Sequence, residues 1–313
     1  MTRKMMQALI SAERKITMAE ENKKPDYTDL DWSWLIRDRE EKWAAMLQEA
    51  DEKGWKKIPL RQTEKFTSQL ILLPIQEETR GIFIVCPGGG FMFKSSNEGK
   101  EVAEYFHGKG INTAILDYHV GSGVAEGVDA RTEAGEDALA AVRYLRAHAE
   151  ELGILPDHIA VGGFSAGGMT TSYASTRFDY GDPAAETAEE ATSSRPDAAL
   201  VLYGAFSSTG MKSGPGAYSI EEQQKAAAMD PIRNIRIDTP PTFVFQTHKD
   251  DPRNALNYCM ELANKGVPYE IHTFEDGPHG GALYDGNHPD SPLFPHTAMW
   301  AEIAADWLKS RGF

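Results

Sequence analysis

Seven short apolar segments, separated by longer stretches, constrain the fold of this 313-residue chain more than any other feature. We expect them as strands at residues 69–74, 81–86, 111–117, 158–162, 198–203, 242–247 and 269–274. Most of the stretches between them carry a helical pattern, in which apolar residues recur along one stripe. Because parallel strands need crossover connections of this kind, the alternation predicts an α/β fold. The expected architecture is a mostly parallel, doubly wound sheet with helices on both faces.

Acidic residues outnumber basic ones, with 47 Asp and Glu against 32 Lys and Arg and a net charge of -15. This charge repels nucleic acids and anionic membrane surfaces, so we expect neither as a partner. The chain has no apolar run long enough to span a bilayer, and its N-terminal residues lack the apolar core of a signal peptide. The two cysteines, Cys86 and Cys259, lie in patterns typical of buried, reduced thiols. We therefore expect a cytoplasmic protein.

Residues 1–57 differ from the rest because they are highly charged and hold four of the six tryptophans. Apolar residues recur at helical spacing up to Gly54, which predicts an amphipathic helix in an N-terminal extension. Such a helix can simply pack on the main domain, or it can form a lid or the contact face of a homo-oligomer. The main domain is expected over residues 58–313, with small insertions near 179–194 and 207–230.

The pattern Gly-x-Ser-x-Gly lies between an expected strand and an expected helix, at residues 163–167. Glycines at its two ends, Gly163 and Gly167, allow the sharp turn that projects a serine hydroxyl outward. The N–H of Ala166 and the dipole of the following helix would face the negative charge that develops there. Ser165 is therefore the candidate nucleophile.

A serine nucleophile needs a base and an acid that orients it. His279 lies in the loop directly after the last expected strand, where parallel α/β sheets place their sites. The acid should follow the preceding strand, where Asp250 and Asp251 are consecutive. We favour Asp251, because it precedes Pro252, and we expect Asp250 to cap the next helix, although the residues themselves leave both aspartates open.

A run of glycines, Gly88 to Gly90, follows the strand expected at 81–86. Without side chains, the N–H groups of Gly89 and Gly90 can approach that of Ala166 and form an oxyanion hole. A phosphate-binding loop would need a Gly-Lys-Ser/Thr ending, or Gly-x-Gly-x-x-Gly with an acid downstream, and the sequence has neither spacing. We expect no metal and no organic cofactor.

Together these motifs resemble those of α/β-hydrolase esterases, and more narrowly of bacterial acetyl-xylan and feruloyl esterase-like enzymes and hormone-sensitive-lipase-like carboxylesterases. The likeness runs from residue 69 to 313. It rests on the glycine loop with Glu98-Gly99, the pair Asp250-Asp251, and segment 277–280 around His279. The other matching segments are 116–120, 138–146, 163–168, 194–197 and 240–243. The chain departs from these groups at Phe91, Pro87 and His119, where tyrosine, histidine and arginine are common. The valine usual after the acid is also missing. The resemblance implies an α/β-hydrolase fold with the triad order Ser165, Asp251, His279.

The residues and the resemblance both predict a serine carboxylesterase with an acyl-enzyme on Ser165 and His279 as general base. The expected partner is a small-molecule ester with a short acyl chain, and the resemblance suggests acetyl groups on xylo-oligosaccharides or other sugars. Phe91, Phe93 and Tyr118 are candidate walls of the substrate pocket, with buried packing as the alternative for each. Two other functions stay open: an amidase or peptidase with the same triad, and a non-catalytic binding module on the same fold.

Overall fold

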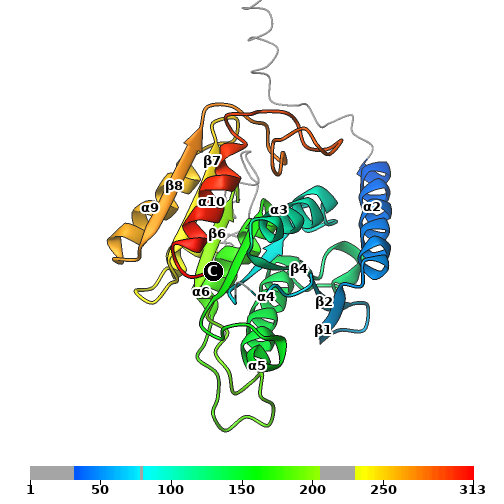
Figure 1. The fold of residues 1–313 in the computed structure, drawn as a ribbon, viewed down its shortest axis with the longest axis vertical. Helices are drawn as coiled ribbons and strands as arrows, with labels where there is room; N and C mark the ends of the chain where they lie inside the picture. Colours follow the sequence, from blue (N-terminus) through cyan, green and yellow to red (C-terminus); the bar gives the residue numbers. More distant parts are fainter. Residues whose placement is uncertain (1–31, 78–79, 205–229) are drawn as a thin grey trace, which may run out of the picture. The chain divides into compact units, whose positions relative to one another are not determined.

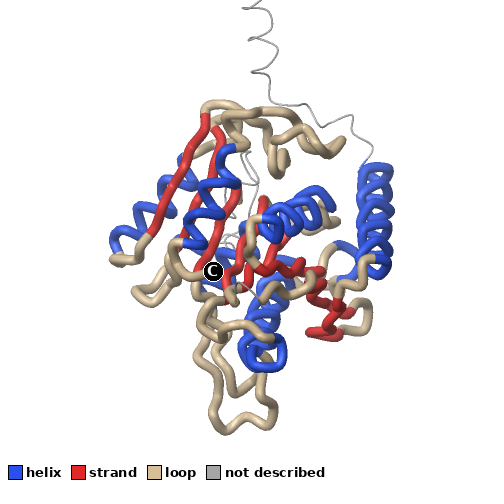
Figure 2. Tube along the Cα trace, in the orientation of Figure 1, coloured by secondary structure: helices blue, strands red, loops and turns tan. Residues whose placement is uncertain are grey.

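The computed structural model describes residues 32–77, 80–204 and 230–313. The chain divides into two compact units, Met1–Arg37 and Asp38–Phe313. The described residues of the first unit form the beginning of helix α2 (Trp32–Glu52). The second unit holds a sheet and the helices that cover it (Figures 1 and 2).

The described residues form one eight-stranded sheet. Its strands are β1 (Lys56–Gln62), β2 (Thr67–Leu72), β3 (Ile82–Cys86), β4 (Asn112–Asp117), β5 (Ile159–Phe164), β6 (Ala198–Leu202), β7 (Thr242–Thr247) and β8 (Tyr269–Phe274). The order across the sheet is β1-β2-β4-β3-β5-β6-β7-β8. The pairs β1/β2 and β2/β4 are antiparallel, and the pairs from β4 to β8 are parallel. The predicted fold class is confirmed.

All seven predicted strands are present, whereas β1 was not predicted. Its sequence, KKIPLRQ, has three apolar residues between polar and charged ones, and most of its side chains are partly or fully exposed. Pro59 is tolerated there because β1 is an edge strand, where a missing N–H donor costs little. Ile58 pairs with Leu70 of β2 and is the fully buried residue of the strand.

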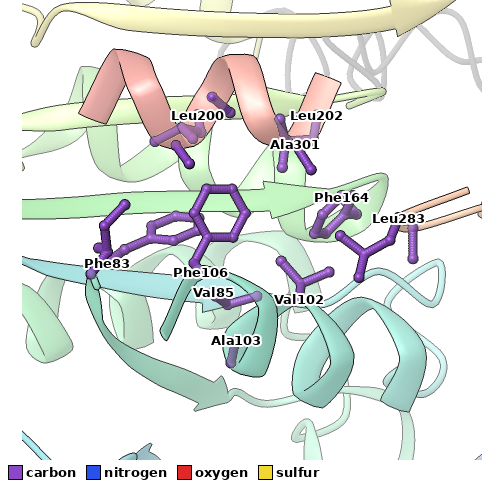
Figure 3. Close-up of a cluster of buried hydrophobic side chains, with 14 of the residues drawn as sticks. Phe83, Val85, Val102, Ala103, Phe106, Phe164, Leu200, Leu202, Leu283 and Ala301 are labelled. Atoms are coloured by element: carbon purple, nitrogen blue, oxygen red, sulfur yellow. The ribbon is translucent and has the colours of Figure 1, made fainter. Parts of the chain in front are cut away.

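Helices cover both faces of the sheet. They are α3 (Val102–Gly108), α4 (Ala130–Ala147), α5 (Ala149–Leu152), α6 (Ala166–Arg177), α8 (Pro231–Asn234), α9 (Arg253–Asn264) and α10 (Met299–Lys309), with a π-helical turn η1 (Asn97–Glu101) and a 3-10 turn η2 (Gly121–Gly123). Side chains of a strand alternate between faces, so one strand contributes to two cores. Phe83 and Val85 of β3 pack with α3 and α10, as Figure 3 shows, while Ile82 and Ile84 pack with α4 and α6.

The expected insertions and the N-terminal extension lie only in part within the described residues. Residues 179–194 form turns and bends without a helix or strand. The second expected insertion, 207–230, lies outside the described residues except for Asp230, which caps α8 through the N–H of Ile232. In α2, Trp43 and Met46 are buried in the core of the second unit. A role of the extension as lid or dimer face stays a prediction.

The helices in the described ranges are all too short or too polar to span a bilayer.

The parallel strands bring distant loops to one edge of the sheet. The glycine loop follows β3, Ser165 follows β5, and Tyr203 follows β6. The aspartate pair follows β7, and the loop with His279 follows β8. Because the carboxyl ends of parallel strands share an edge, these loops lie close together.

Candidate active site

Ser165 occupies the tight turn between β5 and α6 that the sequence predicts. Its backbone has φ 52° and ψ -114°, a conformation that a side chain rarely adopts outside a constrained turn. A Cβ atom at Gly163 would lie 2.4 Å from the carbonyl oxygen of Cys86, and one at Gly167 would lie 2.0 Å from the same oxygen. Both glycines are therefore required by the close approach of β3, and the hydroxyl of Ser165 projects from the turn.

His279 contacts Ser165 and one aspartate at the same time. Its Nε2 atom lies 2.8 Å from Oγ of Ser165, and its Nδ1 atom lies 2.7 Å from Oδ2 of Asp250. The carboxylate can accept only if Nδ1 carries the proton, which leaves Nε2 free to accept the proton of the serine hydroxyl. This arrangement can generate a nucleophile at Ser165.

The structure corrects the choice of acid from Asp251 to Asp250. The carboxylate of Asp251 accepts from Nε of Arg253 at 2.7 and 2.9 Å, and from the backbone N–H of Arg253 at 3.1 Å. Asp251 thus satisfies the beginning of α9, the role expected for Asp250. The reason is the direction of the chain as it leaves β7: Asp250 faces the imidazole, and the next side chain faces solvent.

The charges around His279 determine its protonation. Partial burial of the imidazole disfavours its charged form, but the hydrogen bond and charge of Asp250, with the charge of Glu98, raise the pKa of His279 above its ordinary value. These two carboxylates would stabilise an imidazolium at His279.

The glycine loop lies beside the serine. A Cβ at Gly88 would lie 3.1 Å from Cβ of Ser165, and a Cβ at Gly89 would lie 2.1 Å from the carbonyl oxygen of Phe93. Gly89 and Gly90 have φ of 132° and 62°, conformations open to glycine. Within the described part of the chain, their N–H groups and that of Ala166 have no hydrogen-bond partner. An oxyanion hole made by these three amides stays a prediction that the geometry supports.

The three candidate pocket residues divide between core and cavity. Tyr118 is fully buried and donates to the carbonyl of Pro87 at 2.6 Å, and Phe91 packs against its ring. Both are packing residues in the described structure, which was the alternative reading for each. Phe93 lines a cavity of about 230 Å³, together with Trp43, Phe66, Lys65, Lys94, Glu40, Ala44, Leu47, Val120, Ser122 and Gly123.

In the described residues, no group of three or more His, Cys, Asp or Glu side chains is placed to hold a metal ion.

Two residues next to the triad were not identified as site residues from the sequence. The ring of Tyr203 lies with its centroid 5.1 Å from that of His279, in an edge-on arrangement. Glu98 is buried and hydrogen-bonded to Tyr203. Glu98 belongs to a motif that carried the family resemblance, but the sequence gives no sign of its contact.

A family model described as BD-FAE matches residues 70–259, which is more than half of the chain. The chain belongs to the BD-FAE family. The matched BD-FAE region includes the glycine loop, Ser165 and both aspartates, and it ends before His279. The contact between His279 and Ser165 is therefore an observation of the structure that the BD-FAE match does not include.

Curated relatives of this BD-FAE chain include two longer proteins. Endo-1,4-beta-xylanase B of Butyrivibrio fibrisolvens is 27% identical over 211 residues, which are 64% of this chain and 32% of the relative. Acetylxylan esterase of Xylanibacter ruminicola is 23% identical over 269 residues, 82% of this chain and 51% of the relative. The chain thus spans about a third and about half of these relatives.

The fold of this BD-FAE member is also found in solved structures. An acetyl ester-xyloside bifunctional hydrolase from Caldicellulosiruptor lactoaceticus matches with a TM-score of 0.69 and 27% identity, covering 82% of this chain and 97% of that chain. The α/β-hydrolase fold and the resemblance to esterases, both predicted from the sequence, are confirmed.

Proposed function

We propose that this chain is a serine carboxylesterase that hydrolyses short-chain acyl esters through an acyl-enzyme on Ser165. One observation carries the proposal: the unbroken chain of hydrogen bonds from Asp250 through His279 to Ser165, at distances of 2.7 and 2.8 Å. A hydroxyl hydrogen-bonded to an imidazole, with the imidazole oriented by a carboxylate, is the arrangement that activates serine for acyl transfer.

In the first half of the reaction, Oγ of Ser165 attacks the ester carbonyl carbon while its proton moves to Nε2 of His279. The carbonyl oxygen becomes negative and accepts from the N–H groups of Ala166, Gly89 and Gly90. When the tetrahedral intermediate collapses, the bond to the alcohol oxygen breaks, and His279 gives its proton to that oxygen. Asp250 keeps its charge throughout and stabilises the imidazolium.

In the second half, water replaces the alcohol beside His279. The imidazole takes a proton from water, the resulting hydroxide forms a bond to the acyl carbon, and a second tetrahedral intermediate follows. Its collapse breaks the bond to Oγ of Ser165, which recovers its proton from His279. The products are one carboxylic acid, one alcohol and the unchanged enzyme.

The proposed substrate class is an acetylated carbohydrate. Two similarities favour it: the acetylxylan esterase of Xylanibacter ruminicola among the relatives, and the acetyl ester-xyloside hydrolase among the solved structures. The cavity lined by Phe93, whose N–H donates to the carbonyl of Gly89, adds physical support, because aromatic rings there can pack on the CH face of a sugar while charged groups bind its hydroxyls. We place the reaction in the cytoplasm, in keeping with the two buried, unpaired thiols of Cys86 and Cys259.

The test compares the full chain with Ser165→Ala on p-nitrophenyl acetate, butyrate and octanoate. We expect turnover of the short esters and a loss on the order of 10³-fold or more in the variant. A parallel assay measures acetate release from acetylated xylo-oligosaccharides. Absence of turnover on every ester, or turnover that survives Ser165→Ala, would contradict the proposal and favour an amidase or a binding module.

A further inference from the structure

Glu98 is a buried acid next to the site that the proposed reaction does not use. It lies in the π-helical turn η1, ten residues after Gly88, and its exposed fraction is 2%. Burial of a carboxyl group is costly unless hydrogen bonds compensate it. Single π-helical turns are frequent at functional sites, where they redirect one side chain.

Both oxygens of Glu98 are occupied by donors from different loops of the site. Oε2 accepts from the backbone N–H of Gly88 at 2.8 Å, and Oε1 accepts from the hydroxyl of Tyr203 at 2.6 Å. The hydroxyl of Tyr203 in turn accepts from the backbone N–H of Ala282 at 3.0 Å. One carboxylate thus connects the glycine loop, the end of β6 and the loop that carries His279.

The connected residues are held in unfavourable backbone conformations. Tyr203 has φ 34° and Ala282 has φ 50°, although neither is glycine. Such conformations persist only where surrounding contacts hold them. Tyr203 also packs its ring edge-on against His279, so its position affects the base directly. The hydrogen bonds of Glu98 are the contacts that fix this tyrosine from the side of the glycine loop.

The hydrogen bonds around Glu98 fit an ionised carboxylate. A protonated carboxyl would present a donor on one oxygen, whereas here both oxygens face donors. Burial raises the pKa of Glu98 above its ordinary value, and the hydrogen bonds from Tyr203 and Gly88, with the charges of His279 and Arg39, oppose this rise. Of the groups that face His279, Asp250 and Glu98 are the two carboxylates that favour its imidazolium.

We infer that Glu98 is a positioning residue of the active site, which aligns the oxyanion loop with the base and adds a negative charge behind His279. The inference rests on the proposed esterase function. Glu98 touches no reacting atom: it acts through Gly88, whose loop carries the oxyanion amides, and through Tyr203, whose ring packs on His279.

Two variants separate alignment from charge. Glu98→Gln keeps the shape and one acceptor oxygen but removes the charge, so either the N–H of Gly88 or the hydroxyl of Tyr203 loses its acceptor. Tyr203→Phe removes the hydrogen bond between Tyr203 and Glu98 and keeps the charge. Glu101→Gln, at the end of the same turn, is the matched control, because it removes a charge from a partly exposed carboxylate that pairs with Lys100.

The readout is the pH profile of kcat and KM on p-nitrophenyl acetate, with thermal unfolding measured in parallel. In Glu98→Gln we expect kcat to fall on the order of 10-fold or more with little change in KM, because loop alignment matters most in the transition state. The acid limb of the profile should move to lower pH, since the imidazolium has lost a neighbouring negative charge. Tyr203→Phe should lower kcat without moving the acid limb, and Glu101→Gln should match the wild type.

A purely structural role would lower the unfolding temperature and leave the acid limb in place. If Glu98→Gln has the wild-type kcat and an unmoved acid limb, the inference is wrong. If Glu98→Gln does not fold, a wild-type kcat in Tyr203→Phe overturns the inference instead. Failure of the proposed esterase function looks different. If that function is wrong, the wild type is inactive on esters or Ser165→Ala retains the activity, and both proposals are then contradicted.

Discussion

Nδ1 of His279 lies 2.7 Å from Oδ2 of Asp250, whereas the next residue, Asp251, pairs with Arg253. The two consecutive aspartates therefore form a natural pair of test and control. Asp250→Asn should lower kcat by about 10²- to 10⁴-fold, because an amide can no longer hold the productive tautomer of the imidazole. Asp251→Asn should leave kcat within about 2-fold, since it affects only the helix start. Steady-state kinetics of both variants check this, and equal losses would contradict the assignment of Asp250.

The pH dependence follows from the raised pKa of His279. The imidazole must be neutral to accept the proton of Ser165, so kcat/KM rises with pH as His279 loses its proton. Because Asp250 and Glu98 favour the charged form, the midpoint of this rise should lie above the ordinary histidine value of about 6.5. Asp250→Asn should move the midpoint down. A midpoint at or below the ordinary value in the wild type would show that burial dominates instead.

Gly167→Ala tests the steric origin of the serine turn. Its Cβ would lie 2.0 Å from the carbonyl oxygen of Cys86, so the start of α6 and the end of β3 would have to separate. We expect a loss of about 2–4 kcal/mol in the free energy of unfolding, together with loss of activity. Gly108→Ala, at the end of α3, meets no atom within 4 Å and should be neutral or stabilising by up to about 1 kcal/mol. Urea unfolding of both variants measures the difference, and equal stabilities would contradict it.

The cavity lined by Phe93 predicts that one substitution affects a sugar ester and a simple ester differently. Phe93→Ala removes an aromatic wall that a sugar ring would contact, so KM for acetylated xylo-oligosaccharides should rise by about 3- to 10-fold. Turnover of p-nitrophenyl acetate, which lacks the sugar, should change less. Met92→Ala is the control, because Met92 is exposed and does not line this cavity. A parallel loss on both substrates would place Phe93 in the support of the glycine loop instead.

Much of the site could be predicted from sequence because its constraints are local. The Gly-x-Ser-x-Gly pattern is imposed by the close approach of Cys86, and any strand-to-helix turn of this kind needs the same glycines. His279 was found because the base must follow a parallel strand, and the last strand has one histidine directly after it. Strands β3 to β7 were visible for a similar reason, since strands buried inside a parallel sheet are largely apolar along their length.

The remaining features depend on contacts that a sequence does not display. Asp250 and Asp251 differ by one position, and only the path of the chain after β7 decides which faces the imidazole. The bond between Glu98 and Tyr203 joins residues 105 positions apart. Strand β1 escaped prediction because basic residues and Pro59 interrupt its apolar pattern.

The central claim is that Ser165 carries the acyl group. The most direct measurement is peptide mass mapping of the full chain after brief reaction with p-nitrophenyl acetate and quenching in acid. We expect one added acetyl group on the peptide that contains Ser165, and none on the corresponding peptide of Ser165→Ala. An acetyl group on another residue that persists in Ser165→Ala, or ester turnover without any acyl-enzyme in either protein, would contradict it.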